Sequence, residues 1–590
     1  MSSTFGSFNT VRLGIYAAQK GLDVTGNNIT NINTVGYTRQ HLDQVSLVTS
    51  AADRYYSPYK TRVGQGVLTT GVSQLRDPSL DITYRNASAD VGAADAKLAG
   101  LEDIAQVLDE VGKGENGFSD GVLLNRLNDL RDLISQAITN GIDDYEASIR
   151  TSANDLCVLF RQAANGLADK MEKYQDRLND QVDTINGILS QLRDLNVSIR
   201  DADIRGDEAL ELRDQRNLLL DQLSQYVKIN VTYTEEDLGA GLVVERMNVS
   251  LATGDKNTLV DGEFATQFSL STPMLNPDAA DTAHPYLDPD GNPTSSWELA
   301  AQHPNANFGI TLQPMQDADG FYAKADDLGT AATGRAPLAD GAGGLDGLLL
   351  GDTDLYGALQ STREMLTETG EYTIAGSTDD PDAAIKRGIP YYQKALDSLA
   401  NEFATQMNAL NHIYNADGNL AAGGNLFSIG SNTNNAVDGD TIITAANISV
   451  SKAWAEGTIH MQASSGPDAP SGDTSNLAKF LAVFDQKQTF DPDAVAGGDA
   501  IGTAYEGTFE NMLLNIQSTL AEDQMATTSM LNNYSTTYSE IYSDRESVMG
   551  VDLNDEATNL MVYQKAYTAA CRLMTVLEEA LDSLINGTVV

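Results

Sequence analysis

Apolar residues recur at alternating spacings of three and four at both ends of the chain. Near the N-terminus this seam contains Phe8, Val11, Ile15, Ala18, Leu22, Thr25, Ile29 and Ile32. Near the C-terminus it contains Leu560, Tyr563, Tyr567, Ala570, Met574, Leu577, Leu581 and Leu584. A repeat of 3.5 residues forms a narrow stripe that suits the pairing of helices. We therefore expect helices over 4–32 and about 553–586 that pair with each other and with those of other copies.

The region after the N-terminal helix contains a second set of helical patterns. Residues 37–85 are expected to be extended, and helices are expected over 91–110, 119–139, 143–204 and 207–226. The helix over 143–204 carries its own seam of six heptads, from Cys157 to Ile199. A seam of this length predicts a rod-like helical bundle.

The pattern changes at residue 228. Residues 228–350 are rich in Gly, Asp, Thr and Pro with short alternating runs, which predicts a β or mixed domain. Residues 351–386 are expected to be a polar insert with a short helix, and 425–475 to be β-like and rich in loops. Further helices are expected over 390–413, 475–486 and 506–547.

These patterns predict a multidomain α+β protein of elongated shape. Terminal coiled-coil helices and a long-helix bundle would form its inner domains, and one or more β-rich outer domains would be inserted in the middle. The expected division is an innermost N-terminal part with an extended segment (1–90), the first part of the bundle (91–227), an exposed β-rich domain with the polar insert (228–386), a returning helix with loops (387–475), the second part of the bundle (476–550) and the C-terminal helix (551–590).

Composition limits the partners of this protein. The 590 residues carry a net charge of −46, from 37 basic and 83 acidic residues. Such a charge repels nucleic acids and anionic membranes, so neither is an expected partner. Residues 1–90 have a balance of +2 and residues 551–590 a balance of −4, so nearly all of the negative charge lies between them. The opposite signs of the two ends favour their association.

No apolar run approaches the length of a membrane span, and the first 30 residues lack the pattern of a cleavable secretion signal. The two cysteines, Cys157 and Cys571, are expected to be small buried hydrophobic residues rather than a disulfide.

Two motifs resemble known signatures. Asn27-Asn28-Ile29-Thr30-Asn31-Ile32-Asn33-Thr34-Val35-Gly36-Tyr37-Thr38-Arg39-Gln40 is similar to the N-terminal signature of bacterial flagellar rod, hook and hook-associated proteins. Gly550-Val551-Asp552-Leu553-Asn554-Asp555-Glu556 resembles the C-terminal signature of the same family. The ending Thr38-Arg39-Gln40 most resembles the hook-associated protein 1 version. Residues 262–342 and 351–386 match nothing in that family.

The resemblance implies a structural subunit at the hook–filament junction. It implies a ring of identical copies with the hook protein and a second junction protein as neighbours, and a cytoplasmic export chaperone as a transient partner. It further implies terminal helices that become ordered on assembly. Export through the flagellar type III channel to the extracellular flagellum would fit the absence of a signal. The family-motif residues that we expect to matter are Asn28, Asn31, Asn33, Gly36, Tyr37, Arg39, Gln40, Gly550, Val551, Leu553 and Glu556.

Motifs for chemistry are weak. Gly117-Phe118-Ser119-Asp120-Gly121 has the spacing of a hydrolase nucleophile elbow but lacks the preceding strand, so a helix N-cap is the expected role of Ser119 or Asp120. Acidic turns at 288–292 and 317–320 lack the closing Glu of a calcium loop. No catalytic residue, metal site or cofactor is expected, and hence no enzyme.

Three alternatives remain open at this stage. One is the hook protein or the second junction protein of the same family. Another is a surface adhesin or glycan-binding module in the acidic central domain, and a third is an enzyme within that domain.

Overall fold

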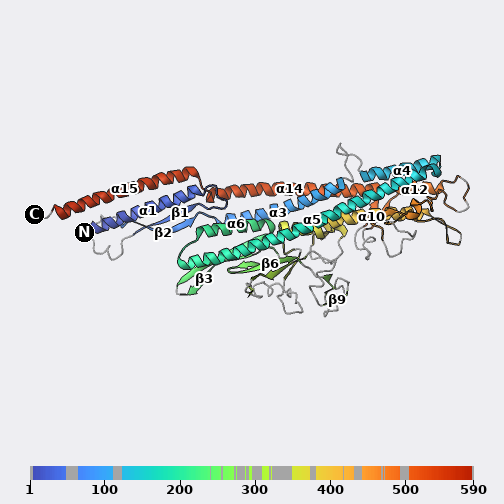
Figure 1. Ribbon diagram of the computed structural model, residues 1–590. Coiled ribbons are helices and arrows are strands. Elements are labelled where there is room, and N and C mark those ends of the chain that lie inside the picture. The colour runs from blue at the N-terminus through green and yellow to red at the C-terminus, as the bar shows by residue number, and fades with distance from the viewer. Residues whose placement is uncertain are drawn as a thin grey trace.

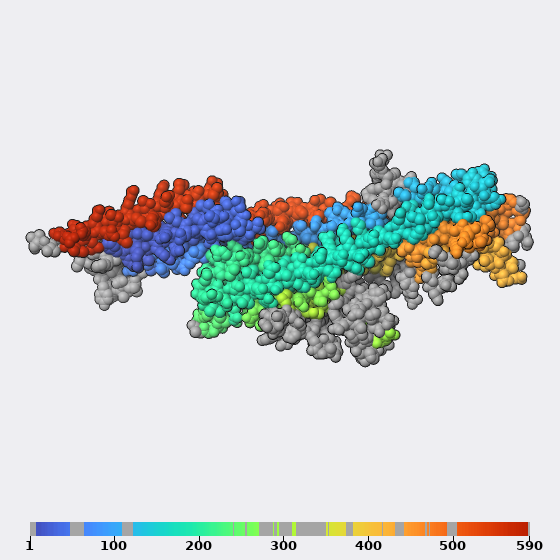
Figure 2. Space-filling model, in the orientation of Figure 1, coloured from blue at the N-terminus to red at the C-terminus, as the bar shows by residue number. Residues whose placement is uncertain are grey.

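The computed structural model describes most of the helical regions and the main sheet. The described residues are 4–47, 64–109, 122–239, 241–253, 257–270, 274–275, 286–287, 292–294, 309–317, 320–321, 348–351, 353–372, 381–415, 417–430, 442–466, 469–470, 472–491 and 504–587. The molecule is elongated. Figure 1 shows a pair of terminal helices at one end and a body of helices and strands at the other. In Figure 2 the pair appears as a narrow arm joined to the broader body.

The arm consists of the first and last helices. Helix α1 (Thr4–Thr30) and helix α15 (Leu553–Asn586) run antiparallel in contact, so both chain ends lie at the far tip of the arm (Figure 1). A ribbon of β1 (Gln40–Ser46) and β2 (Val67–Gln74) lies along α1. The predicted terminal helices are thus confirmed, and so is their association.

Long helices form the frame of the body. They are α3 (Pro78–Asp109), α4 (Val122–Asn140), α5 (Ile142–Arg205), α6 (Leu210–Tyr226) and α14 (Phe509–Met549). α14 packs along α3, whereas α4 and α6 pack on α5. Apolar residues of the predicted seam on α5, such as Phe160, Leu178 and Ile185, are fully buried. α5 ends at Gly206, whose φ of 79° is a left-handed conformation that glycine adopts without strain.

A six-stranded antiparallel sheet covers one side of α5. Its order is β13-β10-β6-β5-β4-β3, with β3 (Ile229–Gly239), β4 (Leu242–Leu251), β5 (Thr258–Asp261), β6 (Phe264–Leu270), β10 (Ile310–Pro314) and β13 (Leu348–Leu350). Asn186 of α5 bonds both backbone groups of Phe268 on β6, at 2.7 and 2.9 Å. The β-rich region expected after residue 228 is therefore confirmed, and it is anchored to the bundle. Five short strands complete it: β7 (Met274–Leu275), β8 (Tyr286–Leu287), β9 (Pro293–Thr294), β11 (Gln316–Asp317) and β12 (Gly320–Phe321).

The returning chain forms the far end of the body. Its helices are α9 (Ala358–Thr367), α10 (Ile389–Asn411), α11 (Lys452–Ala455) and α12 (Ser475–Asp485), with short 3₁₀ helices η2 (Gly370–Tyr372) and η3 (Ala383–Ile385). Three ribbons pair β14 (His412–Tyr414) with β15 (Leu420–Gly423), β16 (Phe427–Ile429) with β17 (Ile448–Val450), and β18 (Gln488–Phe490) with β19 (Tyr505–Gly507). Phe403 joins these parts, since its ring contacts those of Phe427, Phe484 and Phe509.

One sequence expectation is wrong at the start of the body. Residues 37–85 were expected to be extended, but α3 begins at Pro78, and it also runs through the expected domain boundary at residue 90. The side chain of Asp77 accepts a hydrogen bond from the amide of Ser79 at 2.8 Å. An Asp before a Pro at the first helical position is a strong start signal. Here it outweighs the weak apolar periodicity that follows.

A second correction concerns residues 351–386: the short helix expected there is present as α9, but the segment was expected to be a polar insert of an exposed domain. α9 instead packs between α3, α5 and α10. Its Leu359, Met365 and Leu366 are buried, and its buried Arg363 donates to the carbonyl of Leu350 at 3.2 Å. The polar side chains of this segment thus satisfy backbone groups inside the body, which sequence polarity alone does not reveal.

Candidate functional site

The two terminal helices touch closely at a glycine. A Cβ atom on Gly21 would lie 2.5 Å from ring carbons of Tyr563, well inside van der Waals contact. Gly21 is buried, and the ring of Tyr563 occupies the space that a side chain would take. The approach of α1 to α15 at this point therefore requires glycine.

The predicted seam residues fall into three groups. Val11, Thr25 and Ala18 of α1 are buried, and the partly buried members are Phe8, Ile15, Leu22, Ile29, Tyr563, Ala570, Met574, Leu577 and Leu581. Leu560, Tyr567 and Leu584 are exposed. Ile32 is also exposed, because α1 ends at Thr30 rather than at residue 32 as expected. The Asn-rich stretch after Thr30 forms a turn, which removes Ile32 from the seam.

The N-terminal motif folds back on the end of α1. The amide of Asn28 donates to the carbonyl of Gln40 at 2.9 Å and accepts from the amide of Gln40 at 3.0 Å. The hydroxyl of Tyr37 donates to the same Asn28 oxygen at 2.8 Å. Asn28 therefore fixes the chain reversal between the helix and β1. It is buried, which strengthens these bonds because water cannot compete for them.

Other members of the motif shape the turn itself. The side-chain amide of Asn31 donates to Asn27 at 2.9 and 3.0 Å, which closes the end of α1. Gly36 has a φ of 80°, and a Cβ atom on it would lie 3.3 Å from the side chain of Leu218 on α6. Asn33 is exposed, and its side chain forms no hydrogen bond with another described residue.

Arg39 joins both ends of the chain. Its amide donates to the carbonyl of Met549 at the end of α14, and its carbonyl accepts from Leu75, both at 2.9 Å. Its guanidinium lies 2.8 Å from Glu556 of α15, a residue only 2% exposed. One residue thus contacts the start of α15, the end of α14 and the strand leading to α3.

The C-terminal motif forms the second connection between arm and body. The amide of Gly550 donates to Glu546 at the end of α14, where a Cβ atom would lie 2.5 Å from the same carbonyl. Asp552 caps α15 by accepting from the amide of Asn554 at 2.7 Å. Val551 is half-buried and Leu553 is exposed. The structure therefore brings Glu556 to the N-terminal motif but leaves Leu553 outside the contact.

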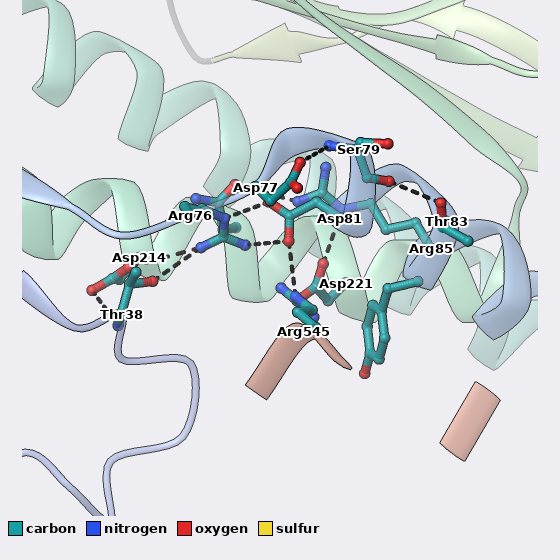
Figure 3. A network of polar contacts seen from close by, with 12 residues as sticks. Thr38, Arg76, Asp77, Ser79, Asp81, Thr83, Arg85, Asp214, Asp221 and Arg545 are labelled. Carbon is teal, nitrogen blue, oxygen red and sulfur yellow. Dashed lines mark hydrogen bonds and ion pairs between the residues drawn. The ribbon is translucent and has the colours of Figure 1, made fainter. Parts of the chain in front are cut away.

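Beneath this joint lies a buried network of ion pairs (Figure 3). The backbone amide of Thr38 donates to Asp214 of α6 at 3.1 Å. Arg76 pairs with Asp81 and lies 3.9 Å from Asp214. Arg76 thus lies between Asp81 of α3 and Asp214 of α6.

The network continues to the end of α14. Arg545 lies 2.8 Å from Asp81 and 2.6 Å from Asp221. Arg85 pairs with Asp221 at 2.9 Å, and the guanidinium of Arg545 lies 4.3 Å from the ring centre of Tyr84. Charge-assisted contacts therefore join α3, α6 and α14.

Burial acts differently on two carboxyl groups of this network. Burial tends to raise the pKa of Asp81, but hydrogen bonding by Arg76 and the charges of Arg76, Arg545 and Arg85 hold its pKa below the usual value. For Asp214, burial dominates and raises the pKa, because the amide of Thr38 and the more distant Arg76 compensate only in part. Of the two carboxyl groups, Asp214 is therefore the one whose burial is less fully offset by hydrogen bonds and neighbouring positive charges.

Sequence reasoning missed this network. Arg76, Asp81, Arg85, Asp214, Asp221 and Arg545 were not among the predicted site residues. A signal existed in the spacing, since Asp214 and Asp221 are seven apart on α6, and Asp81 and Arg85 are four apart on α3. Such spacings place the side chains on one helix face but do not say which partners they meet.

We find no metal-binding group and no disulfide among the described residues. Among the described residues, no group of three or more His, Cys, Asp or Glu side chains could hold a metal ion. Cys157 is buried and Cys571 is partly buried, and the two thiols are free. Residues 117–121, 288–291 and 318–319, which contain the weak motifs, lie outside the described residues. None of the described helices combines the length and hydropathy needed to span a bilayer.

Three family models match separate parts of the chain. The model for the "flagellar hook-associated protein FlgK helical domain" matches residues 117–296. The "flagella basal body rod protein" model matches 10–38, and the "flagellar basal body rod FlgEFG protein C-terminal" model matches 546–587. The last two ranges cover most of α1 and all of α15, the two helices of the arm.

Full-length relatives point the same way. Flagellar hook-associated protein 1 of Bacillus subtilis (strain 168) is 27% identical over 598 residues, which span 100% of this chain and 99% of the relative. The protein of the same name from Salmonella typhimurium strain LT2 is 24% identical over 602 residues, 98% of this chain and 99% of the relative. Among solved structures, the flagellar hook junction protein FlgK from Burkholderia pseudomallei matches with a TM-score of 0.37 and 19% identity, over 59% of this chain and 47% of that one. The relatives match the chain from end to end and the family models match three of its parts, so the chain is similar along its whole length to flagellar hook-associated protein 1.

Proposed function

We propose that the chain is a structural subunit of the junction between the flagellar hook and filament. Copies of it would form a ring that adapts the hook below to the filament above and that filament assembly requires. The end-to-end similarity to flagellar hook-associated protein 1 supports this role. So does the architecture, because a narrow arm fixed rigidly to a body suits a subunit that packs side by side with others.

The observation that carries the proposal is a second apolar stripe on α15. Val562, Ala566, Ala569, Leu573, Val576 and Ala580 recur at spacings of four and three, about 100° around the helix from the seam that faces α1. All six are exposed, and Val562, Leu573 and Val576 each retain more than half of their accessible surface. Isolated proteins seldom leave such a continuous apolar face in water. Neighbouring copies in a ring would cover it.

The proposal includes specific partners. The ring would contact the hook protein on one side and the second junction protein on the other. An export chaperone would hold the C-terminal region before export through the flagellar type III channel to the cell exterior. The terminal helices would become fully ordered only on assembly, because two helices alone bury little surface. The chain would act without catalysis, metal or cofactor, and without nucleic acid or membrane as a partner.

The proposed domain division follows the two ends of the molecule. Because α3 begins at Pro78, residues 1–77 and 551–590 would form the innermost layer of the ring, and the bundle of 78–227 and 476–550 the layer outside it. The β-rich part within 228–386 would face outward, and 387–475 would complete the far end. The seam and motif residues would act in the innermost layer.

Electron microscopy of cells that lack this protein tests the proposal. We expect hooks without filaments, together with unassembled filament protein in the medium. A chain lacking residues 4–32 or 553–586 should fail to restore filaments although its body folds. Normal filaments on cells without the protein, or on cells with either truncated form, would refute the junction role.

A further inference from the structure

Residues of α5, β3 and β4 line an open hollow of about 590 Å³. The end of α5 and the strand β3 lie at the end of the body that faces the arm (Figure 1). The end of α5, the turn into α6 and the strands β3 and β4 form the walls of the hollow. Glu208 on its rim reaches to 3.2 Å from the position of a Cβ atom on Gly71 of β2. The hollow is therefore next to the joint but not part of the ion-pair network described above.

The lining of the hollow is mostly polar, and its apolar part, called the floor below, belongs to β3 and β4. Tyr233 and Val243 line it and remain 43% and 49% exposed. β3 is the last strand in the order of the sheet, so one side of its backbone has no strand partner in the described part of the chain. An apolar floor beside an open strand edge suits an extended or turn-like peptide that carries aromatic side chains.

The inner wall of the hollow is electrically balanced. Arg213 lies 3.0 Å from Asp203 and 2.7 Å from Glu245, and Arg216 lies 2.6 Å from the same Glu245. Burial tends to raise the pKa of Glu245. The charges and hydrogen bonds of Arg216 and Arg213 outweigh burial and hold this pKa below its usual value.

The rim, by contrast, carries unneutralised charge. Asp207, Glu208 and Glu235 line the hollow and are exposed. Within the described part of the chain, no Lys or Arg forms an ion pair with any of them. A partner that fits this surface therefore carries about three cations around aromatic or apolar groups.

The chain itself contains a segment of this kind. Two stretches of nine residues carry three cations and no carboxylate, namely 54–62 and 386–394. In the second, Lys386 pairs with Glu364 and Arg387 with Glu371 and Asp523, so its charge is used inside the body. The first reads Arg54-Tyr55-Tyr56-Ser57-Pro58-Tyr59-Lys60-Thr61-Arg62 and joins β1 to β2. It combines three cations with three tyrosines in a chain whose net charge is −46.

The described ends of this segment lie far from the hollow of the same copy. The hydroxyl of Thr10 donates to the carbonyl of Gln65 at 3.2 Å, which places the ribbon's far end well along α1. From Gly64 to Gly71, which neighbours the hollow, the strand covers roughly 23 Å. The segment would have to run back fully extended to reach its own hollow. A neighbouring copy can present its hollow without that constraint.

We propose that residues 54–62 of one copy bind in the hollow of an adjacent copy, with their cations on the rim carboxylates and their tyrosines on the floor. This inference rests on the proposed ring, because it requires a neighbour. It adds a second contact between copies, made by the body rather than by the terminal helices.

Peptide binding tests the fit of the hollow directly. The probe is a synthetic peptide of residues 52–64 with blocked ends, titrated into the full chain and followed by fluorescence anisotropy. We expect saturable binding that weakens about tenfold or more when salt rises from about 50 to about 300 mM. Glu208→Lys with Glu235→Lys should abolish it. A peptide of permuted order and equal composition should bind at least tenfold more weakly.

A matched variant guards against general charge attraction. Asp180→Lys with Asp183→Lys makes the same change in net charge at exposed positions of α5, about 35 Å along the helix from Gly206. This variant should bind the peptide as the unmodified chain does. Equal losses in both double variants, equal binding of the permuted peptide, or no saturable binding would overturn the proposal.

Cross-linking tests whether the contact joins two copies. Two forms of the chain, each with Cys157→Ala and Cys571→Ala, carry Tyr59→Cys in one and Val243→Cys in the other, and both are produced in cells lacking the native protein. We expect disulfide-linked pairs of the two forms in isolated flagella. If flagella assemble and the peptide binds but no such pairs form, this inference fails while the proposed junction role stands. If no flagella assemble with either single form although its body is folded, purified chains mixed at high concentration supply the same readout.

Discussion

The guanidinium of Arg39 lies 2.8 Å from the carboxylate of Glu556, 517 residues further along the chain. Glu556 is almost completely buried, whereas the side chain of Arg39 is about one-fifth exposed. The same arginine holds the end of α14 through its amide. The two terminal motifs are therefore parts of one structural site, and Arg39 is the residue at which arm and body meet.

Removing only one partner of this pair should cost more than removing both. Arg39→Ala leaves the buried carboxylate of Glu556 unpaired, at a cost of about 3 kcal/mol. We expect fewer hooks with filaments in cells that carry it. Arg39→Met combined with Glu556→Gln should restore part of the loss, because no buried charge remains. Electron microscopy of hooks gives the measurement.

Arg12→Ala is the control for this pair, since Arg12 is exposed and its described contact is with Asn9 on the same helix. It should leave filament number unchanged. If the double variant proves as defective as Arg39→Ala, the defect does not come from an unpaired Glu556.

Substitution by alanine should impair assembly at Gly21 of α1 but not at Gly14 of the same helix. Gly21→Ala places a Cβ atom 2.5 Å from the ring of Tyr563, and overpacking of this kind costs about 1–3 kcal/mol. Gly14→Ala meets nothing within 4 Å, and alanine favours a helix by about 1 kcal/mol over glycine. Motility and filament counts should fall for Gly21→Ala and stay normal for Gly14→Ala. Equal effects at both positions would contradict the observed packing of α1 on α15.

Charges on different faces of α15 should separate pairing within a copy from contact between copies. Leu577→Asp and Ile15→Asp place a charge in the seam between α1 and α15, at a cost on the order of 3 kcal/mol. Val576→Asp places it on the exposed stripe instead. All three should block assembly while circular dichroism shows a folded body. Thr575→Asp, on the polar face, should assemble normally. Normal assembly of Val576→Asp would remove the proposed contact of that stripe with neighbours.

Asp397 should give the body a specific pH dependence. Burial raises the pKa of Asp397 to about 6, and the backbone amide of Ala445 compensates only in part, at 2.8 Å. The folded state therefore holds a proton between about pH 4 and 6 that the unfolded state has lost. Below pH 4 this contribution to stability is fully present, and it disappears as pH rises through 6, a change of about 3 kcal/mol.

Asp397→Asn should remove that dependence. The amide oxygen can still accept from Ala445, so we expect the variant to gain stability over the unmodified chain at pH 7 and to lose this advantage at pH 4. Denaturant unfolding across this range measures the difference. Asp180→Asn, at an exposed position of α5, is the control and should show no such divergence. If the free energy of unfolding changes with pH in the same way for Asp397→Asn and the unmodified chain, burial does not raise the pKa of Asp397.

The candidate site was only partly visible in the sequence. Arg39 and Glu556 were both in the predicted motifs, since each stands beside residues of recognisable pattern. Their mutual contact was not predicted, because no local pattern relates positions this far apart. Asp214 and Arg545 went unnoticed for the same reason, although each lies on a correctly predicted helix. Their function in the network depends on which helix faces lie together.

The sequence by itself determined where α1, α5 and α15 run and that the two ends pair. The 3.5-residue repeats on α1, α5 and α15 are local and strong, and burying such stripes requires partner helices. Only the tertiary structure decided that α9 is internal and that α15 keeps an apolar face in water. Each of these depends on how many neighbours surround a helix, and that number is set by contacts between segments hundreds of residues apart, not by the order of residues within one segment.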